Sequence, residues 1–262
     1  MVSKRANTDL WQRLRALTPA RIALARTGSA LATDEVLRLA LAHARARDAV
    51  HQPLDVDALA AAFDAAGFAH LRVHSAAPDR VTYLLRPDLG RRLRVADRDA
   101  LEADAATAPD LSFVVADGLS AGAVQRHALP LLCAFRELGG AGRWSVTPVV
   151  IAEQGRVALG DEIGELMRAR LVVVLIGERP GLSAPDSLGL YVTHAPRVGR
   201  TDAERNCLSN VRPGGLSVEE AARRLAWLVE AALERGLTGI ALKDEAGLGA
   251  IAGREGAALP AG

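Results

Sequence analysis

Aromatic residues, cysteines and an excess of either charge are all scarce or missing in this chain of 262 residues. Only 3% of the residues are aromatic although 50% are hydrophobic, so the core must be built mainly from alanine, leucine and valine. Lysine and arginine together number 32, and aspartate and glutamate number 31. A balance so close to zero shows neither the basic surface of a nucleic-acid-binding protein nor the charge pattern of a membrane-surface protein, and neither partner is expected.

The two cysteines, Cys133 and Cys207, provide neither a disulfide framework nor the spacing of a zinc site. A reducing, cytoplasmic setting is therefore expected. The start of the chain is too polar for a signal peptide, and no apolar stretch reaches the roughly 18 residues of a transmembrane helix. No metal site is expected either, because His70 and His74 stand about 13 Å apart along a predicted strand.

The common catalytic and nucleotide-binding motifs are also missing. No G-x-G-x-x-G follows a predicted strand, and neither G-x-x-x-x-G-K-[ST] nor G-x-S-x-G appears. The glycine cluster at 139–142 follows a predicted helix, so it marks a helix end rather than a phosphate-binding loop. A Rossmann-type NAD enzyme and a P-loop NTPase are therefore not expected.

An alternation of predicted strands and helices is the main feature that the sequence does contain. The predicted helices cover residues 33–50, 54–66, 96–106, 121–138, 160–169 and 217–235. The predicted strands cover residues 68–74, 81–85, 111–116, 146–152, 171–176, 190–194 and 239–242. This order indicates an α/β fold with a doubly wound, mostly parallel sheet and an N-terminal helical part.

We expect four segments along the chain. Residues 1–17 form a short lead-in, and residues 18–107 form the N-terminal helical part with short strands. Residues 108–243 form the sheet domain, and residues 244–262, rich in glycine and alanine, form a flexible tail.

The apolar run Leu171–Ile176 is typical of a strand that is buried on both faces. The loop that follows it, Gly177–Gly189, is the first site candidate, because ligands of open α/β sheets bind beyond the carboxyl ends of the strands. The alternative is a plain surface loop in which Glu178 and Arg179 are solvated or paired with each other.

Two further loops leave a similar choice open. Asp117-Gly118-Leu119-Ser120 lies between a predicted strand and a helix N-terminus, which suits an anion or polar ligand but also a plain turn and cap. The loop 86–92 holds three arginines and one aspartate, and it either binds an anionic group or covers a surface.

Cys207 lies in segment 202–212, which carries two amides, two arginines and two carboxylates and is expected to be a loop. The thiol can serve as a nucleophile, although no histidine is near it in the sequence. The residues alone favour the alternative of a small apolar contact.

Six motifs in order resemble the small (light) subunit of ethanolamine ammonia-lyase, over about residues 15–243. They are RPDLGRR (86–92), VADGLS (115–120), GRV (155–157), GDEIGE (160–165), GERPGL (177–182) and RNCLSN (205–210). The resemblance implies an enzyme that converts ethanolamine into acetaldehyde and ammonia by adenosylcobalamin radical chemistry. It also implies a hetero-oligomer in which the large subunit holds the substrate and a Rossmann-like small subunit helps to bind the corrinoid at the interface.

The same resemblance assigns cobalamin contacts to Val157, Glu178 and Cys207, and it assigns no catalytic residue and no metal ligand to this chain. Longer N-terminal extensions in the family accompany packaging into a bacterial microcompartment. With the short lead-in found here, the cytoplasm is the expected location and a microcompartment is the alternative. The competing hypotheses are a self-contained α/β enzyme that uses Cys207 or Glu178 on a small anionic ligand, and a pure interaction module.

Overall fold

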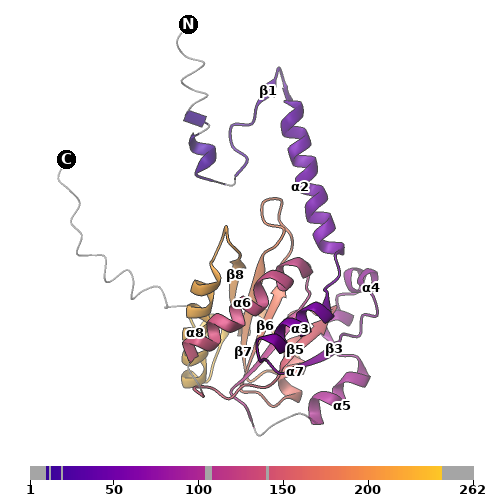
Figure 1. The fold of residues 1–262 in the computed structure, drawn as a ribbon, viewed down its shortest axis with the longest axis vertical. Helices are drawn as coiled ribbons and strands as arrows, with labels where there is room; N and C mark the ends of the chain where they lie inside the picture. The colour runs from indigo at the N-terminus through magenta and orange to yellow at the C-terminus, as the bar shows by residue number, and fades with distance from the viewer. Residues whose placement is uncertain (1–9, 12, 19, 104–107, 140–141, 244–262) are drawn as a thin grey trace, which may run out of the picture.

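The computed structural model describes residues 10–11, 13–18, 20–103, 108–139 and 142–243, and its centre is a six-stranded sheet (Figure 1). The strand order is β3-β5-β4-β6-β7-β8. The strands are β3 (His70–His74), β4 (Leu111–Ala116), β5 (Val149–Glu153), β6 (Leu171–Gly177), β7 (Leu188–His194) and β8 (Arg205–Val211). With helices on both faces of this sheet, the predicted α/β class is confirmed.

The sheet is mixed rather than parallel throughout. β3, β5, β4 and β6 run parallel, whereas β7 is antiparallel to β6 and β8 is antiparallel to β7. The direction changes because the loop 178–187 joins β6 to its neighbour β7 without a crossover helix, and such a hairpin connection gives antiparallel pairing. The sheet is therefore parallel over four strands and mixed as a whole, and the predicted Rossmann-like, doubly wound arrangement is not confirmed.

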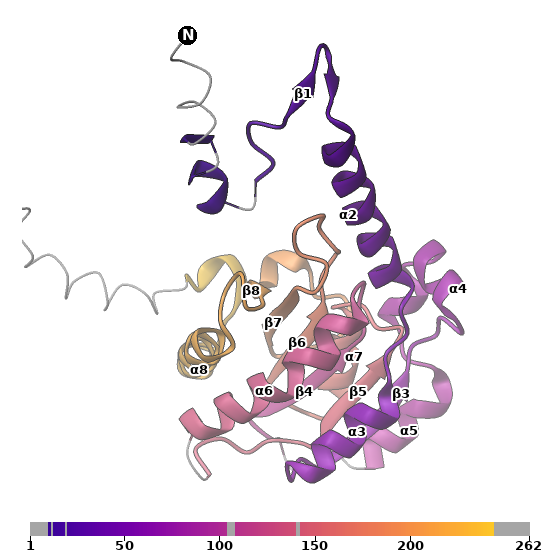
Figure 2. The same ribbon diagram turned by 45° about the horizontal axis from the view of Figure 1, so that its top comes forward.

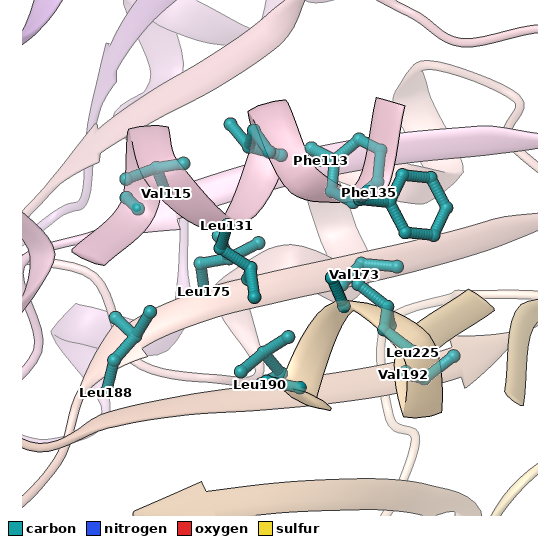
Figure 3. Close-up of a cluster of buried hydrophobic side chains, with 14 of the residues drawn as sticks. Phe113, Val115, Leu131, Phe135, Val173, Leu175, Leu188, Leu190, Val192 and Leu225 are labelled. Atoms are coloured by element: carbon teal, nitrogen blue, oxygen red, sulfur yellow. The ribbon is translucent and has the colours of Figure 1, made fainter. Parts of the chain in front are cut away.

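The larger part of the core lies on the sheet face that is covered by α3 (Val56–Ala65), α6 (Ala121–Gly139) and α8 (Val218–Arg235). Figure 3 shows side chains of β4, β6 and β7 meeting those of α6 and α8 in this cluster. The scarce aromatic residues are concentrated here, with Phe113 packed edge-on against Phe135 at 5.3 Å between ring centroids. Leucine, valine and alanine make up most of the rest, as the composition predicted.

The opposite face is covered by α5 (Val95–Ala103) and α7 (Leu159–Leu166). α7 lies very close to the sheet, because a Cβ atom on Gly160 would stand 2.2 Å from Val174 Cγ2. Beyond α7, over β7 and β8, this face keeps Tyr191 only half-buried. The antiparallel extension therefore offers an open surface next to the carboxyl ends of the parallel strands.

Helix α2 (Thr33–His51) projects away from the sheet, with the hairpin β1 (Arg26–Thr27) and β2 (Ala30–Leu31) at its far end (Figures 1 and 2). The predicted helix is confirmed, but its apolar side does not pack on the body. Leu37 is 63% exposed and Leu41 is 51% exposed. Ala32 occupies the N-cap position and, among the described residues, provides no side-chain cap.

Three local predictions are wrong. Residues 81–85 belong to helix α4 (Arg80–Leu85), because the Asp79 carboxylate accepts a hydrogen bond from the Thr82 N–H (2.8 Å) and starts a helix in a β-favouring sequence. The predicted last strand is the 3₁₀ helix η3 (Gly239–Ala241). The segment around Cys207 is the short η2 (Asp202–Glu204) followed by strand β8 rather than a loop.

Several expectations fall partly outside the described residues: the lead-in over 1–9, the end of the helix over 96–106, and the tail over 244–262. The division into segments stays a prediction, and β3, which precedes residue 108, is the edge strand of the same sheet. Within the described residues, no helix combines the length and apolar character that crossing a bilayer requires.

Candidate functional site

Two adjoining hollows lie on the open side of the sheet, and the first of them is at the carboxyl ends of the parallel strands. The first, which we call the strand-end hollow, has a volume of about 410 Å³. Its walls come from the segments that follow β4 and β5, from the end of β6 and from β7. It is lined by Tyr83, Gly118, Leu119, Arg156, Val157, Ile176, Gly177, Glu178, Arg179 and Tyr191. This is the position at which open α/β sheets bind ligands.

The second, which we call the arginine hollow, has a volume of about 490 Å³. It shares Arg156, Val157 and Tyr191 with the first, so the two form one continuous surface. It is lined by Arg91, Arg156, Val157, Ala158, Tyr191, Arg200, Thr201, Asp202 and Arg205. The arginine-rich loop 86–92 thus reaches the site through Arg91.

Main-chain atoms form part of the strand-end hollow. The Leu119 N–H donates to the Gly177 carbonyl oxygen at 2.9 Å, which ties the end of β4 to the end of β6. Gly118 has φ +58°, and a Cβ atom there would stand 2.2 Å from the Gly177 oxygen. A side chain at Gly118 would therefore meet both an unfavourable backbone conformation and a direct clash.

Asp117, the first residue after β4, is 2% exposed and is turned inward. Its carboxylate accepts hydrogen bonds from the N–H groups of Gly118 (2.9 Å) and Gly155 (3.0 Å) and lies 3.4 Å from Arg80 Nη1. Burial dominates over these contacts and raises the pKa of Asp117 to about 6. Asp117 thus stabilises the turns after β4 and β5 through hydrogen bonds. This favours the interpretation of residues 117–120 as a plain turn and cap over direct binding of a ligand by Asp117.

Tyr83 carries a guanidinium group against its ring from each of two arginines. The Arg80 guanidinium lies 4.7 Å from the ring centroid and that of Arg156 lies 4.5 Å from it. The Tyr83 hydroxyl donates to the Gly155 carbonyl at 3.2 Å, and burial raises its pKa to about 12. This packing fixes Arg156 where the two hollows meet.

Glu178 crosses over Gly189 to reach strand β8. A Cβ atom on Gly189 would stand 2.9 Å from Glu178 Oε1, so only glycine leaves room for this path. The carboxylate accepts hydrogen bonds from the Ser187 hydroxyl, from the Ser209 hydroxyl (2.5 Å) and from the Asn210 N–H (3.1 Å). In the described structure Glu178 therefore binds strand β8 and Ser187, the residue before β7, rather than its sequence neighbour Arg179.

Val157 and Cys207 lie on either side of Tyr191. Val157 is half-buried and lines both hollows. Cys207 stands opposite Tyr191 in the β7–β8 register, and its thiol is hydrogen-bonded with the Tyr191 hydroxyl. Although the residue as a whole is exposed, partial burial of the thiol raises its pKa. The thiol thus stays protonated near neutral pH, which disfavours the nucleophile alternative.

The fold gathers the three residues that the resemblance named around one tyrosine, and sequence reasoning missed that tyrosine. Tyr191 sits between buried Leu190 and Val192 in a strand, so the alternation places its ring on the opposite, open face. A tyrosine on the open face of a strand, in a chain with so few aromatic residues, is the feature of the sequence that could have indicated a site residue. The stacking of Arg156 on Tyr83 joins residues 73 positions apart, and no local pattern predicts it.

A third hollow of about 560 Å³ lies at the opposite edge, where β3 and β5 begin. Its walls are largely apolar, and the Arg136 guanidinium stacks on the Phe68 ring at 4.1 Å. None of the predicted site residues lines it. Among the described residues, no three histidine, cysteine, aspartate or glutamate side chains are grouped so that they could hold a metal ion.

Comparison with known proteins agrees with the motifs. The family model described as "Ethanolamine ammonia-lyase light chain (EutC)" matches residues 8–243. The chain is 57% identical over 244 residues to the ethanolamine ammonia-lyase small subunit of Azotobacter vinelandii (strain DJ / ATCC BAA-1303), covering 92% of this chain and 90% of the relative. It is 58% identical over 246 residues to that of Pseudomonas aeruginosa (strain UCBPP-PA14), covering 93% and 90%. The chain therefore belongs to the ethanolamine ammonia-lyase light-chain family, as a subunit of that lyase.

Proposed function

We propose that the strand-end hollow is this chain's part of an adenosylcobalamin site, and that the chain works with a large catalytic subunit to convert ethanolamine into acetaldehyde and ammonia. The observation that carries the proposal is that Val157 and Glu178 line the strand-end hollow together with Tyr191, while Cys207, which is not among the described residues lining either hollow, stands opposite Tyr191 in the β7–β8 register. When bound, adenosylcobalamin supplies the hydrogen-abstracting radical chemistry of the reaction.

The residues present fit a corrinoid. A corrin is a broad ring with apolar faces and a rim of amide groups, and Val157 and Tyr191 offer a half-buried apolar surface for such a face. The Glu178 carboxylate has about four acceptor positions and uses three of them within the chain. One position is left for an amide N–H of the rim, so Glu178 orients the cofactor and does no acid–base work. Cys207 contributes a small contact beside Tyr191.

The large subunit completes the site in this proposal. Both hollows are open at the surface of the chain, and the described residues of their walls include no histidine and no activated nucleophile. The exposed apolar side of α2 supports association with a further chain, and the relatives are named as small subunits. We assign Leu37 and Leu41 to contact with the large subunit, and we expect this chain alone to be inactive. The hetero-oligomer is expected in the cytoplasm or in a microcompartment.

The test is co-expression with a candidate large subunit, followed by an ethanolamine deamination assay with and without adenosylcobalamin. We expect activity only when both chains and the cofactor are present. The Cys207→Ala variant should weaken cofactor binding and retain turnover at a saturating cofactor concentration. Full activity of this chain alone, or loss of turnover in Cys207→Ala at saturation, would favour the self-contained enzyme instead. An unchanged corrinoid spectrum in the assembled complex would favour a pure interaction module.

A further inference from the structure

We infer that the arginine hollow binds the phosphodiester group of the corrinoid's nucleotide tail, with Arg156 and Arg91 as the binding residues. The inference rests on the proposed function, because the tail is covalently attached to the ring that the strand-end hollow would face. The phosphodiester is the one anionic group of cobalamin, since the side chains around its ring end in neutral amides. A surface that binds cobalamin can therefore use unpaired cationic groups at one place only, next to the phosphodiester.

The charges of the hollow leave two arginines available. Four arginines and one carboxylate line it. The buried Arg205 guanidinium already binds the Asp161 carboxylate through both terminal nitrogens, with Nη2 to Oδ2 at 2.7 Å. Arg200 pairs with Glu204. Arg91 and Arg156 pair with no carboxylate in the described part of the chain.

The Arg156 side chain is fixed in position, but not all of its N–H groups have a hydrogen-bond acceptor. Its Nη2 donates to the Tyr83 carbonyl oxygen at 2.9 Å, and its guanidinium lies on the Tyr83 ring. Its Nε is buried and has no acceptor among the described residues. A buried cationic N–H without an acceptor is costly and points to a group that is supplied from outside the chain.

The backbone brings Arg91 beside Arg156. The Arg156 N–H donates to the Gly90 carbonyl oxygen at 2.8 Å, and a Cβ atom on Gly90 would stand 3.1 Å from Arg156 Cγ. Because Gly90 contacts Arg156, the adjacent residue Arg91 is held beside the Arg156 side chain. The one carboxylate of loop 86–92, on Asp88, is already paired with Arg86 at 2.7 Å. Arg91 is exposed and is left for an outside partner.

The place and size of the hollow suit a group attached to the corrin. Arg156, Val157 and Tyr191 belong to both hollows, so a ring over the strand-end hollow can extend its tail into the arginine hollow without a break. A volume of about 490 Å³ accommodates a phosphodiester with its neighbouring sugar. Two guanidinium groups provide the forked N–H donors that phosphate oxygens accept best.

The experiment measures dissociation constants of the assembled two-chain complex from the change in the corrinoid absorption spectrum in the dark. The two ligands are adenosylcobalamin and adenosylcobinamide, which lacks the nucleotide tail. The variants are Arg91→Ala, Arg156→Gln and Arg156→Lys, and Arg92→Ala is the matched control because Arg92 is exposed and lines neither hollow. Inorganic phosphate serves as a competitor, and thermal unfolding checks that each variant is folded.

Arg91→Ala should weaken adenosylcobalamin about fivefold, as for an exposed ion pair. Arg156→Gln should weaken it about tenfold to a hundredfold, with partial recovery in Arg156→Lys. Binding of adenosylcobinamide should stay unchanged in Arg91→Ala. In the Arg156 variants it should fall much less than binding of adenosylcobalamin, because Arg156 also lines the strand-end hollow. Arg92→Ala should leave the binding of both ligands unchanged. Phosphate should compete with adenosylcobalamin in the unaltered complex and much less in Arg91→Ala.

Equal losses for the two corrinoids would overturn the inference, because the arginines would then act on the ring or on the fold. Unchanged binding of adenosylcobalamin in Arg91→Ala and Arg156→Gln would overturn it as well. Phosphate that binds the arginine hollow without displacing adenosylcobalamin would assign the hollow to another phosphorylated ligand. If the unaltered complex bound neither corrinoid, the proposed function itself would fail, which separates the two conclusions.

Discussion

Helices α8 and α2 have nearly the same length, 18 and 19 residues, and both carry apolar side chains at helical spacing. In α8 those side chains are buried against the sheet, and Leu225 is fully covered. In α2 the equivalent side chains, Leu37 and Leu41, are more than half exposed. The spacing of apolar residues thus predicts a helix with one apolar face. It does not predict whether that face is buried within the same chain or against another chain.

The charges of the two regions differ in the same way. In the body, Asp161 of α7 and Arg205 of β8 form an ion pair in which both side chains are 2% exposed. On α2, the Arg38–Asp34 pair is largely exposed, at 3.2 Å. In a buried pair both charges lose their hydration, so removing one partner leaves the other charge uncompensated in the interior. An exposed pair is screened by water and contributes little to stability. The body and the projecting helix should therefore respond very differently to equivalent substitutions.

The largest expected effect is at the buried ion pair. Arg205→Ala should lower the free energy of unfolding by about 3–5 kcal/mol, because it leaves the Asp161 carboxylate without its partner in the interior. The matched change Arg47→Ala on α2, where both members of the Arg47–Asp48 pair are exposed, should cost less than about 1 kcal/mol. Urea unfolding of the two variants measures both values, and a similar loss in the two would contradict the contrast.

The next effect compares one substitution in the two helices. Leu225→Ala should cost about 2–5 kcal/mol, because it creates a cavity in the covered side of α8. Leu37→Ala should stay within about 0.5 kcal/mol of the unaltered chain. Both follow from unfolding in urea. A large loss in Leu37→Ala would mean that the apolar side of α2 is already covered within this chain.

A pH series tests the buried carboxyl of Asp117. Its pKa is raised to about 6 from its usual 3.8, so the folded chain holds this proton more tightly than the unfolded chain does. The associated stability is present below about pH 4 and is lost as the pH rises through 6. The loss amounts to about 3 kcal/mol at most. In Asp117→Asn this loss should be absent, so the difference between the two unfolding free energies should change between pH 4 and 7. A constant difference over that range would show that the carboxyl is not perturbed.

The smallest effect on stability should accompany a clear effect on assembly. The double variant Leu37→Ser, Leu41→Ser should unfold within about 1 kcal/mol of the unaltered chain, because both side chains are exposed. Its affinity for the large subunit should fall roughly tenfold, since apolar contact area is lost from the interface. Sedimentation or titration with the purified large subunit measures the affinity, and Val146→Ser on the body is the control. Equal affinity in the double variant would remove α2 from the proposed interface.

The sequence predicted the buried parts of the fold better than the half-open parts. Uninterrupted apolar runs such as those of β4 and β6 identify strands because both faces are covered. The sequence predicts a loop at β8 because one face of that strand is exposed and carries polar residues such as Cys207 and Ser209. It predicts a strand at 81–85 because it weighs the preference of the β-branched residues above the single helix cap, Asp79.

The ends of the predicted strands indicated where the candidate site lies, but its three named contact residues were predictable only through the family motifs. Those motifs named Val157, Glu178 and Cys207, which lie far apart in the sequence, and the residues alone gave no reason to group them. The surrounding contacts depend on close approaches between distant segments, such as Glu178 with Ser209 and Gly90 with Arg156. Such contacts follow from the whole fold, and no local pattern in the sequence records them.

The closeness of Gly118 to Gly177 has a consequence for how this site can vary. A Cβ atom on Gly177 would stand 2.1 Å from the Ser120 carbonyl oxygen, as one on Gly118 would stand 2.2 Å from Gly177. At this point the two strand ends touch mainly through peptide groups, with the Ile176 side chain beside them. Substitutions at other surrounding positions therefore barely alter the shape of this part of the site. Relatives can then exchange the residues of the rim and tune affinity for a ligand, while the depth at which the ligand rests stays constant.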